Sequence, residues 1–248
     1  MKKIVLAFDN KGLTLIELLV AFVISSLIIA AIYRFFTAQN KSYIVQDQVV
    51  EVQQGIKGAM DLLSRDLRMA GYDNNNPNSL IGLPGEDPLV KIRDPIIAMD
   101  HQISILYEFN NTTLYTITYR LNPTDGTTLE RQIITTDNNG NNNPGPWVAV
   151  LENVNAFDLE YGIDGPFGAE DGSMDMSAGW GGAADLYATK TVGGVPTTYM
   201  IVTPIAVRVT LSARPDQTNE DVRKMISPRT LTAIVNLRNK SLVKTNPA

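Results

Sequence analysis

The chain has 248 residues, a formal net charge of −5 and no cysteine, and 44% of its residues are hydrophobic. The lack of cysteine excludes a disulfide framework, thiol catalysis and a cysteine metal site. An acidic chain without a basic cluster also argues against general nucleic-acid binding, which depends on the neutralisation of phosphates. The length leaves room for one ordinary globular domain beyond an N-terminal anchor.

The first predicted element is an apolar helix behind a short charged leader. Residues 1–12 hold three lysines and one aspartate, a net charge of +2, so the rest of the chain carries −7. The segment from Leu13 to Tyr33 is long enough to cross a bilayer, and Glu17 is its only charge. A carboxylate in a membrane span is costly and usually functional. The positive leader is expected to stay in the cytoplasm, with everything after Tyr33 across the membrane.

The junction between leader and helix, residues 11–20, reads KGLTLIELLV. It resembles the class III signal of the type IV pilin superfamily, in which a charged leader ends in Gly and an apolar helix carries Glu five residues later. The resemblance implies that prepilin peptidase cuts between Gly12 and Leu13, and that the new N-terminus at Leu13 is methylated. The family usually has Phe at the position of Leu13. The resemblance further implies that Glu17 pairs with the α-amine of a neighbouring subunit during assembly.

A continuous helix is predicted from Leu13 to about Ala70, because no proline precedes Pro77. Its second half carries an apolar stripe at helical spacing, which is expected to pack on the chain's own sheet; an assembly face is the alternative. The stripe consists of Val45, Val49, Val52, Ile56, Leu63 and Leu67, with Ala59 and Met60 between them. Gly71, with Pro77 beyond it, predicts the end of the helix.

The pattern changes to β from residue 102 onward, after a loop with short extended pieces over 74–100. Three strands over 102–107, 114–121 and 127–136 are predicted to form a meander. Strands are also predicted over 147–151, 156–162, 200–214 and 229–238, with Pro204 indicating an edge or a bulge. The Gly-rich residues 163–198 predict a long exposed loop, and residues 219–226 a short helix.

Later segments extend the resemblance. Residues 63–72 (LSRDLRMAGY), 207–214 and 235–239 are similar to the stalk end and the C-terminal strands of PilW-like minor pilins, and J-type minor pseudopilins share much of this pattern. The resemblance implies an α+β pilin-like fold, a long N-terminal helix on an antiparallel β-sheet. The expected divisions are a leader (1–12), a transmembrane or filament-core helix (13–36), an amphipathic stalk (37–72) and a β-rich globular domain (73–248).

Oxygen-rich segments invite comparison with a calcium site. The run 137–141 has alternating oxygen ligands, but its Gly is misplaced for an EF-hand loop and no Glu closes it. The acidic residues of the predicted loop offer a second set of ligands: Asp164, Glu170, Asp171, Asp175 and Asp185. The expected interpretation is a solvated polar turn in both places, so no cofactor is predicted, with calcium as the alternative.

Several single residues have more ordinary interpretations. His101 is the only histidine, which excludes a His-paired nucleophile and a multi-His metal site, so a strand-edge position is expected. Asp66 and Arg68 are expected to make weak surface or stalk–sheet pairs. Trp147 is expected to plug the sheet, and Trp180 to be exposed, where it would suit partner binding.

The resemblance implies a minor type IV pilin that is processed by prepilin peptidase and enters or primes a filament with other minor and major pilins. The alternatives are a minor pseudopilin of a type II secretion system, and a pilus-tip binding subunit with residues 163–198 as an adhesive loop. A membrane-anchored periplasmic enzyme is disfavoured, since the sequence offers no catalytic constellation. The expected location is the bacterial inner membrane with a periplasmic domain, and later an extracellular pilus, without direct nucleic-acid binding.

Overall fold

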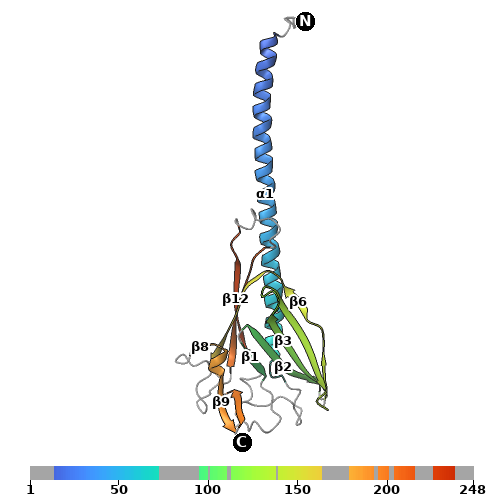
Figure 1. The fold of residues 1–248 in the computed structure, drawn as a ribbon, viewed down its shortest axis with the longest axis vertical. Helices are drawn as coiled ribbons and strands as arrows, with labels where there is room; N and C mark the ends of the chain where they lie inside the picture. Colours follow the sequence, from blue (N-terminus) through green and yellow to red (C-terminus); the bar gives the residue numbers. More distant parts are fainter. Residues whose placement is uncertain are drawn as a thin grey trace, which may run out of the picture. The chain divides into compact units, whose positions relative to one another are not determined.

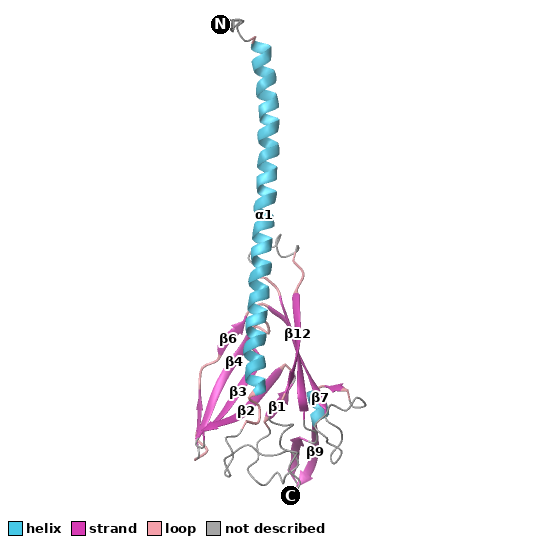
Figure 2. Cartoon of the chain, turned by 180° about the vertical axis from the view of Figure 1, so that it is seen from behind, coloured by secondary structure: helices cyan, strands magenta, loops and turns pink. Residues whose placement is uncertain are grey.

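The computed structural model describes residues 14–72, 95–99, 101–110, 113–137, 139–163, 179–192, 195–200, 204–215 and 226–237. In these residues one long helix, α1 (Leu15–Arg68), is accompanied by antiparallel β-sheets (Figures 1 and 2). The predicted α+β, pilin-like layout is therefore confirmed. The chain forms two compact units, residues 1–47 and 48–248, and α1 contributes to both.

Local sequence accounts for both ends of α1, which lie within about two residues of their predicted positions. At the C-terminal end, the amides of Met69 and Ala70 donate to carbonyls three residues back, which tightens the last turn. Gly71 follows with φ of 72°, a left-handed conformation that costs glycine little. The predicted stop at Gly71 is confirmed, while Pro77 lies outside the described residues.

In the first unit, α1 is apolar on every face. Its side chains from Leu15 to Phe36 are exposed almost throughout, including Phe22 and Leu27 at 66% each. By length and composition this helix is able to cross a membrane. An aliphatic surface of this extent is not stable against water, so it needs lipid or other apolar helices around it.

In the second unit, α1 buries one face. The buried residues recur at spacings of three and four and include Val52, Ile56, Ala59, Met60, Leu63, Asp66 and Leu67. The predicted apolar stripe is confirmed from Val52 onward, and it packs on the chain's own sheets as expected.

The first sheet is a meander in the order β1-β2-β3-β4-β5, with β6 also paired to β4. Its strands are β1 (Ile96–Met99), β2 (Gln102–Asn110), β3 (Thr113–Leu121), β4 (Leu129–Asp137), β5 (Asn142–Pro144) and β6 (Val148–Leu151). The three predicted strands of the meander are confirmed. The turn before β4 forms because the Asp125 carboxylate accepts the amides of Thr127 and Thr128, and Gly126 adopts φ of 65°.

The second sheet has the order β12-β11-β7-β8. Its strands are β7 (Val154–Ile163), β8 (Trp180–Gly181), β11 (Pro204–Ala213) and β12 (Arg229–Asn236). Pro204 was predicted to mark an edge or a bulge. The edge is wrong, because β11 lies between β12 and β7, but the β11–β7 register shifts between Pro204 and Ala206, as at a bulge. The predicted helix over 219–226 lies almost entirely outside the described residues.

The prediction of an exposed loop over 163–198 is wrong for its second part. A short 3₁₀ helix, η1 (Ala183–Leu186), follows β8, and β9 (Tyr187–Val192) pairs with β10 (Val195–Met200) as an antiparallel hairpin. The sequence places Gly193-Gly194 between two runs rich in Thr, Val and Tyr, a hairpin signal that the surrounding glycines obscured. Residues 164–178 lie outside the described residues.

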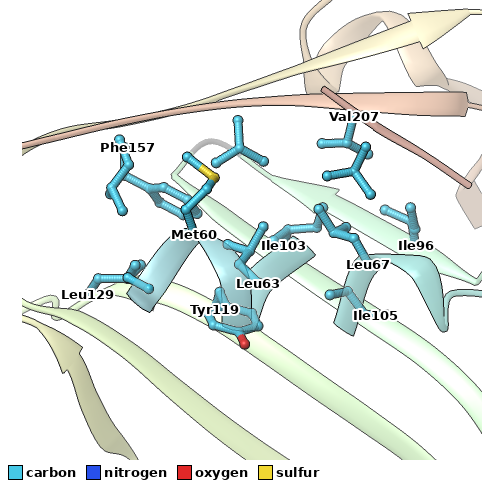
Figure 3. Close-up of a cluster of buried hydrophobic side chains, with 14 of the residues drawn as sticks. Met60, Leu63, Leu67, Ile96, Ile103, Ile105, Tyr119, Leu129, Phe157 and Val207 are labelled. Carbon is cyan, nitrogen blue, oxygen red and sulfur yellow. The ribbon is translucent and has the colours of Figure 1, made fainter. Parts of the chain in front are cut away.

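The core of the second unit lies between the buried face of α1 and the two larger sheets. Figure 3 shows Met60, Leu63 and Leu67 of α1 among side chains from both sheets. The first sheet contributes Ile96, Ile103, Ile105, Tyr119 and Leu129, and the second contributes Phe157 and Val207. Burial of these large side chains, at roughly 25 cal/mol per Å² of apolar surface, is what holds the helix to the sheets.

Candidate functional site

Glu17 lies in the first turn of α1, where it makes three reciprocal hydrogen bonds with Thr14. The Thr14 amide donates to Glu17 Oε2 over 2.9 Å, and the Thr14 hydroxyl donates to the same oxygen over 2.8 Å. The Glu17 amide in turn donates to Thr14 Oγ1 over 3.4 Å. This is a capping box, in which the side chains at the helix start satisfy amides that have no partner in the helix.

The capping box was not predicted, although its signal is present in the sequence. Thr14 and Glu17 stand three residues apart at the start of an apolar run, which is the spacing of the motif. A lone charge in an apolar helix suggests a partner outside the chain. That interpretation of Glu17 obscured its local role as part of the helix cap. The structure gives the carboxylate a function within its own chain.

Apolar side chains lie beside the exposed Glu17 side chain on the helix surface. A shallow groove of about 300 Å³ runs along one helix face past Glu17 and is lined by Ile16, Val20, Ala21 and Ile24. Both hydrogen bonds from Thr14 end on Oε2, so Oε1 remains able to accept from a further donor. A carboxylate beside an apolar groove is stabilised most by a cationic partner, because an unpaired charge in an apolar environment is costly.

The predicted processing residues Gly12 and Leu13 lie outside the described residues. The geometry at the cut therefore remains a prediction. The structure does place Thr14, the next residue, at the N-cap of α1. A cut after Gly12 would leave a single residue in front of the helix cap.

A second polar cluster, in the globular unit, joins α1 to the first sheet. Asp66 is 5% exposed, and its Oδ2 accepts from the Tyr119 hydroxyl over 2.7 Å and from Nε and Nη2 of Arg131 over 2.9 Å each. Burial raises the pKa of the Tyr119 hydroxyl, and the hydrogen bond to Asp66 raises it further. Of the two expected kinds of pair, the stalk–sheet pair is confirmed and the surface pair is wrong, because Asp66 of α1 is buried and makes charge-assisted bonds with Arg131 of β4.

The two tryptophans occupy similar settings on different sheets. The Arg120 guanidinium lies 3.6 Å from the ring centroid of Trp147, and that of Arg208 lies 4.1 Å from the centroid of Trp180. Trp147 is half-buried and stacks on Arg120, so the prediction that it plugs the sheet is wrong. Trp180 is also only half exposed, which corrects its predicted exposure.

His101 lies in the tight turn between β1 and β2, with φ of 55°, and its Nδ1 is 3.0 Å from the carbonyl oxygen of Phe157. The expected strand-edge position is therefore a turn position beside the second sheet. The sequence signal was weak, because a lone histidine carries no periodicity.

The candidate calcium ligands serve local turns where they are described. Asp137 accepts the amides of Asn139 and Asn141, and Asp185 accepts the amide of Gly182. No group of three or more His, Cys, Asp or Glu side chains in the described part of the chain is arranged to hold a metal ion. The other four acids of the second set lie outside that part: Asp164, Glu170, Asp171 and Asp175.

A comparison with curated protein sequences gives no match. The family description "Prokaryotic N-terminal methylation motif" matches residues 8–33, which include Gly12, Leu13 and Glu17. Proteins with this motif are generally structural, and the apolar helix together with the motif suits a bacterial protein anchored in the inner membrane. With the long helix packed on antiparallel sheets, the motif supports a type IV pilin-like or pseudopilin-like protein that is processed by prepilin peptidase.

Proposed function

We propose that this chain is a minor type IV pilin of the PilW-like group that enters a pilus or primes its assembly. The observation that carries the proposal is Glu17, held in the first turn of an exposed apolar helix within the matched methylation motif. In this proposal the chain is a structural subunit and not an enzyme. No cofactor is needed for that role, and calcium remains the alternative at the oxygen-rich turns.

Cleavage after Gly12 would place a new α-amine at Leu13, one residue before the helix cap. The helix start already carries a partial positive charge, so this amine adds to a site that favours a nearby carboxylate. Glu17 supplies that carboxylate, and the groove beside it provides an apolar surface on which a neighbouring helix would pack. Methylation of Leu13 would keep the amine cationic while enlarging its apolar surface. Pairing of this amine with Glu17 of an adjacent subunit would then align the two helices.

Before assembly, the apolar part of α1 would lie in the inner membrane, with the globular domain in the periplasm. On assembly the same surface would leave lipid for the helices of other minor and major pilins in an extracellular filament. Lipid and the packed helices of a filament are both apolar environments. The transfer would therefore replace lipid contacts by helix contacts without exposing α1 to water. The net charge of −7 expected after cleavage fits a role without direct nucleic-acid binding.

The test is peptide mass spectrometry of the N-terminus in filaments sheared from native cells. The expected result is a peptide that begins at N-methylated Leu13. A Gly12→Val variant is the control, since a side chain at the cut should leave the leader attached and keep the protein in the membrane fraction. Native protein found only in membranes, still beginning at Met1, would contradict the proposal.

A minor pseudopilin is the second candidate, because the matched motif serves that group as well. Deletion of the gene distinguishes the two functions, because either piliation or type II secretion should be lost. Loss of surface pili with intact secretion supports the pilin. Loss of secretion with normal piliation supports the pseudopilin.

A further inference from the structure

A long groove runs along the second unit between α1 and the last strand, β12, which lies beside α1 in both Figures 1 and 2. Its volume is about 1100 Å³. Ile56 and Met60 of α1 contribute apolar side chains at its floor, and Leu231 and Ala233 contribute them at the wall formed by β12. The groove therefore combines apolar side chains with polar and charged ones along one edge of the second sheet.

β12 is unusual among the outer strands of the two larger sheets. It has eight residues, whereas β1, β5, β6 and β8 have four, three, four and two. Short outer strands limit unwanted pairing, and charged residues or proline do the same. After Arg229, the sequence of β12 has neither, and Leu231 and Ile234 are 38% and 58% exposed. Among the described strands β12 has no partner on its outer side.

The register shows which backbone groups face outward. The Leu237 amide donates to the Ile205 carbonyl over 2.8 Å, and the β11–β12 register continues this pairing through Val235 and Val207. Inward and outward groups alternate along an antiparallel strand. The N–H and C=O groups that face the open edge therefore belong to Thr230, Thr232, Ile234 and Asn236. They form a ready template for another strand.

The charge at the groove is opposite to that of the chain as a whole. Its lining holds four cationic side chains (Lys57, Arg65, Arg68 and Arg229) and one carboxylate (Asp61), in a chain of net charge −5. Arg68 already interacts within the molecule, and Arg65 Nε lies 3.6 Å from Asp66 Oδ1, so the argument depends on Lys57 and Arg229. This charge favours an acidic occupant and disfavours the basic C-terminal residues 238–248 of the same chain.

We infer that the groove is a docking site for an extended, acidic segment of a partner protein, which adds a strand to β12. A strand at the usual spacing of about 4.8 Å from β12 would continue the second sheet over the face of α1. Alternate side chains of that strand would point into the groove, apolar ones over Ile56 and Met60 and carboxylates towards Lys57 and Arg229. This inference does not depend on cleavage at Gly12 or on the proposed pilus.

The first test uses the purified full chain in detergent micelles and two synthetic peptides. One peptide is Glu-Thr-Val-Thr-Val-Thr-Val-Thr-Glu, and the other has Lys in place of both Glu residues. We expect the acidic peptide to bind about tenfold more tightly or better, and to slow amide hydrogen exchange at Thr230, Thr232 and Ile234. Equal binding of both peptides, no binding at millimolar concentration, or binding that leaves these amides unprotected would each overturn the inference. The last result would indicate a helix or another mode of contact.

Matched variants separate the backbone contribution from the charge. Thr232→Pro removes an outward N–H without breaking the β11 ladder, and Thr232→Ala removes the same hydroxyl but keeps the N–H. We expect the Pro variant to weaken binding of the acidic peptide about fivefold or more relative to the Ala variant. Lys57→Glu with Arg229→Glu should weaken it about tenfold, whereas Lys41→Glu, outside the groove, should not. Equal affinities within either comparison would contradict the corresponding contact.

A photoreactive amino acid at position 234 tests the partner in intact cells. The expected crosslink joins this position to a single acidic segment of another protein, located by mass spectrometry of the joined peptides. A crosslink to a second copy of this chain, or to a segment without carboxylates, would show that the occupant is not the one inferred.

Discussion

The two parts of α1 contain similar apolar side chains in opposite surroundings. In residues 15–47, Leu27 is 66% exposed, whereas Leu63, in the globular unit, is 1% exposed. The difference lies in the arrangement of the apolar residues. From Leu15 to Phe36 the first part is apolar on every face, so no single surface of its own chain could cover it. The second part has one apolar face, which is buried against its own sheets from Val52 to Leu67.

The largest expected effect comes from the polar anchor of the second part. Arg131→Met leaves the buried Asp66 carboxylate with the Tyr119 hydroxyl and without its guanidinium, so the free energy of unfolding should fall by about 3 to 5 kcal/mol. The measurement is urea unfolding of the full chain in detergent. Arg65→Met is the control, because that side chain is 70% exposed and should change stability little. Equal losses of unfolding free energy in the two variants would show that the Asp66–Arg131 pair does not stabilise the fold more than an exposed arginine does.

Leucine truncation tests the comparison directly. Leu63→Ala should reduce the free energy of unfolding of the globular unit by about 3 kcal/mol, because it leaves a cavity in a packed core. Leu27→Ala makes the same chemical change on the exposed part, and should leave the urea transition nearly unchanged. It should instead reduce membrane retention or filament incorporation. Similar urea midpoints for the two variants would contradict the division of α1 into two kinds of surface.

Alkaline pH should loosen the second part selectively. Burial, reinforced by the Asp66 hydrogen bond, raises the pKa of Tyr119 above its ordinary value of 10.0. Above about pH 10 the unfolded chain releases this proton while the folded protein keeps it, so the free energy of unfolding falls as pH rises, by about 1.4 kcal/mol per pH unit. Below pH 10 the contribution is fully present.

Tyr119→Phe should flatten that alkaline slope, and Tyr33→Phe, on the exposed part of α1, should not. Urea titrations between about pH 8 and 11 give the slope for each variant. An unchanged slope in the Tyr119→Phe variant would assign the alkaline loss to other groups.

The smallest expected effect is at the start of the first part. Thr14→Ala removes the hydroxyl of the capping box, so amide exchange at Ile16 and Glu17 should accelerate about fivefold while the globular unit is unaffected. Thr14→Ser keeps the hydroxyl and should restore the slow exchange. Hydrogen exchange followed by mass spectrometry provides the readout. Equal exchange in the Ala and Ser variants would mean that the helix start does not depend on this side chain.

The fold could be predicted where the sequence pattern is local. Leu13 to Ala70 lacks proline, and the strands over 102–136 alternate, so α1 and the meander followed from periodicity alone. The hairpin of β9 and β10 was missed because the glycines around it are typical of a loop. The sequence Gly193-Gly194 gives a hairpin signal only when the flanking Thr and Val residues are considered with it.

The polar sites were harder to predict because their partners are remote. Asp66 stands beside Arg65 in the sequence, but its main partners are 53 and 65 residues away along the chain. No spacing rule joins them before the sheet is formed. The capping box depends on the local spacing of Thr14 and Glu17, so the sequence could predict this role of Glu17. The proposed pairing of Glu17 with another subunit involves a second chain.

The continuity of α1 has a mechanical consequence. No proline interrupts α1 from Leu15 to Arg68, so tension applied at its first turn is carried along a continuous ladder of backbone hydrogen bonds. The load arrives in the last turns, where Asp66 is bonded to β3 and β4 through Tyr119 and Arg131. These bonds would act in shear together with the buried apolar contacts of Met60, Leu63 and Leu67, and both would resist the removal of the helix from its sheets.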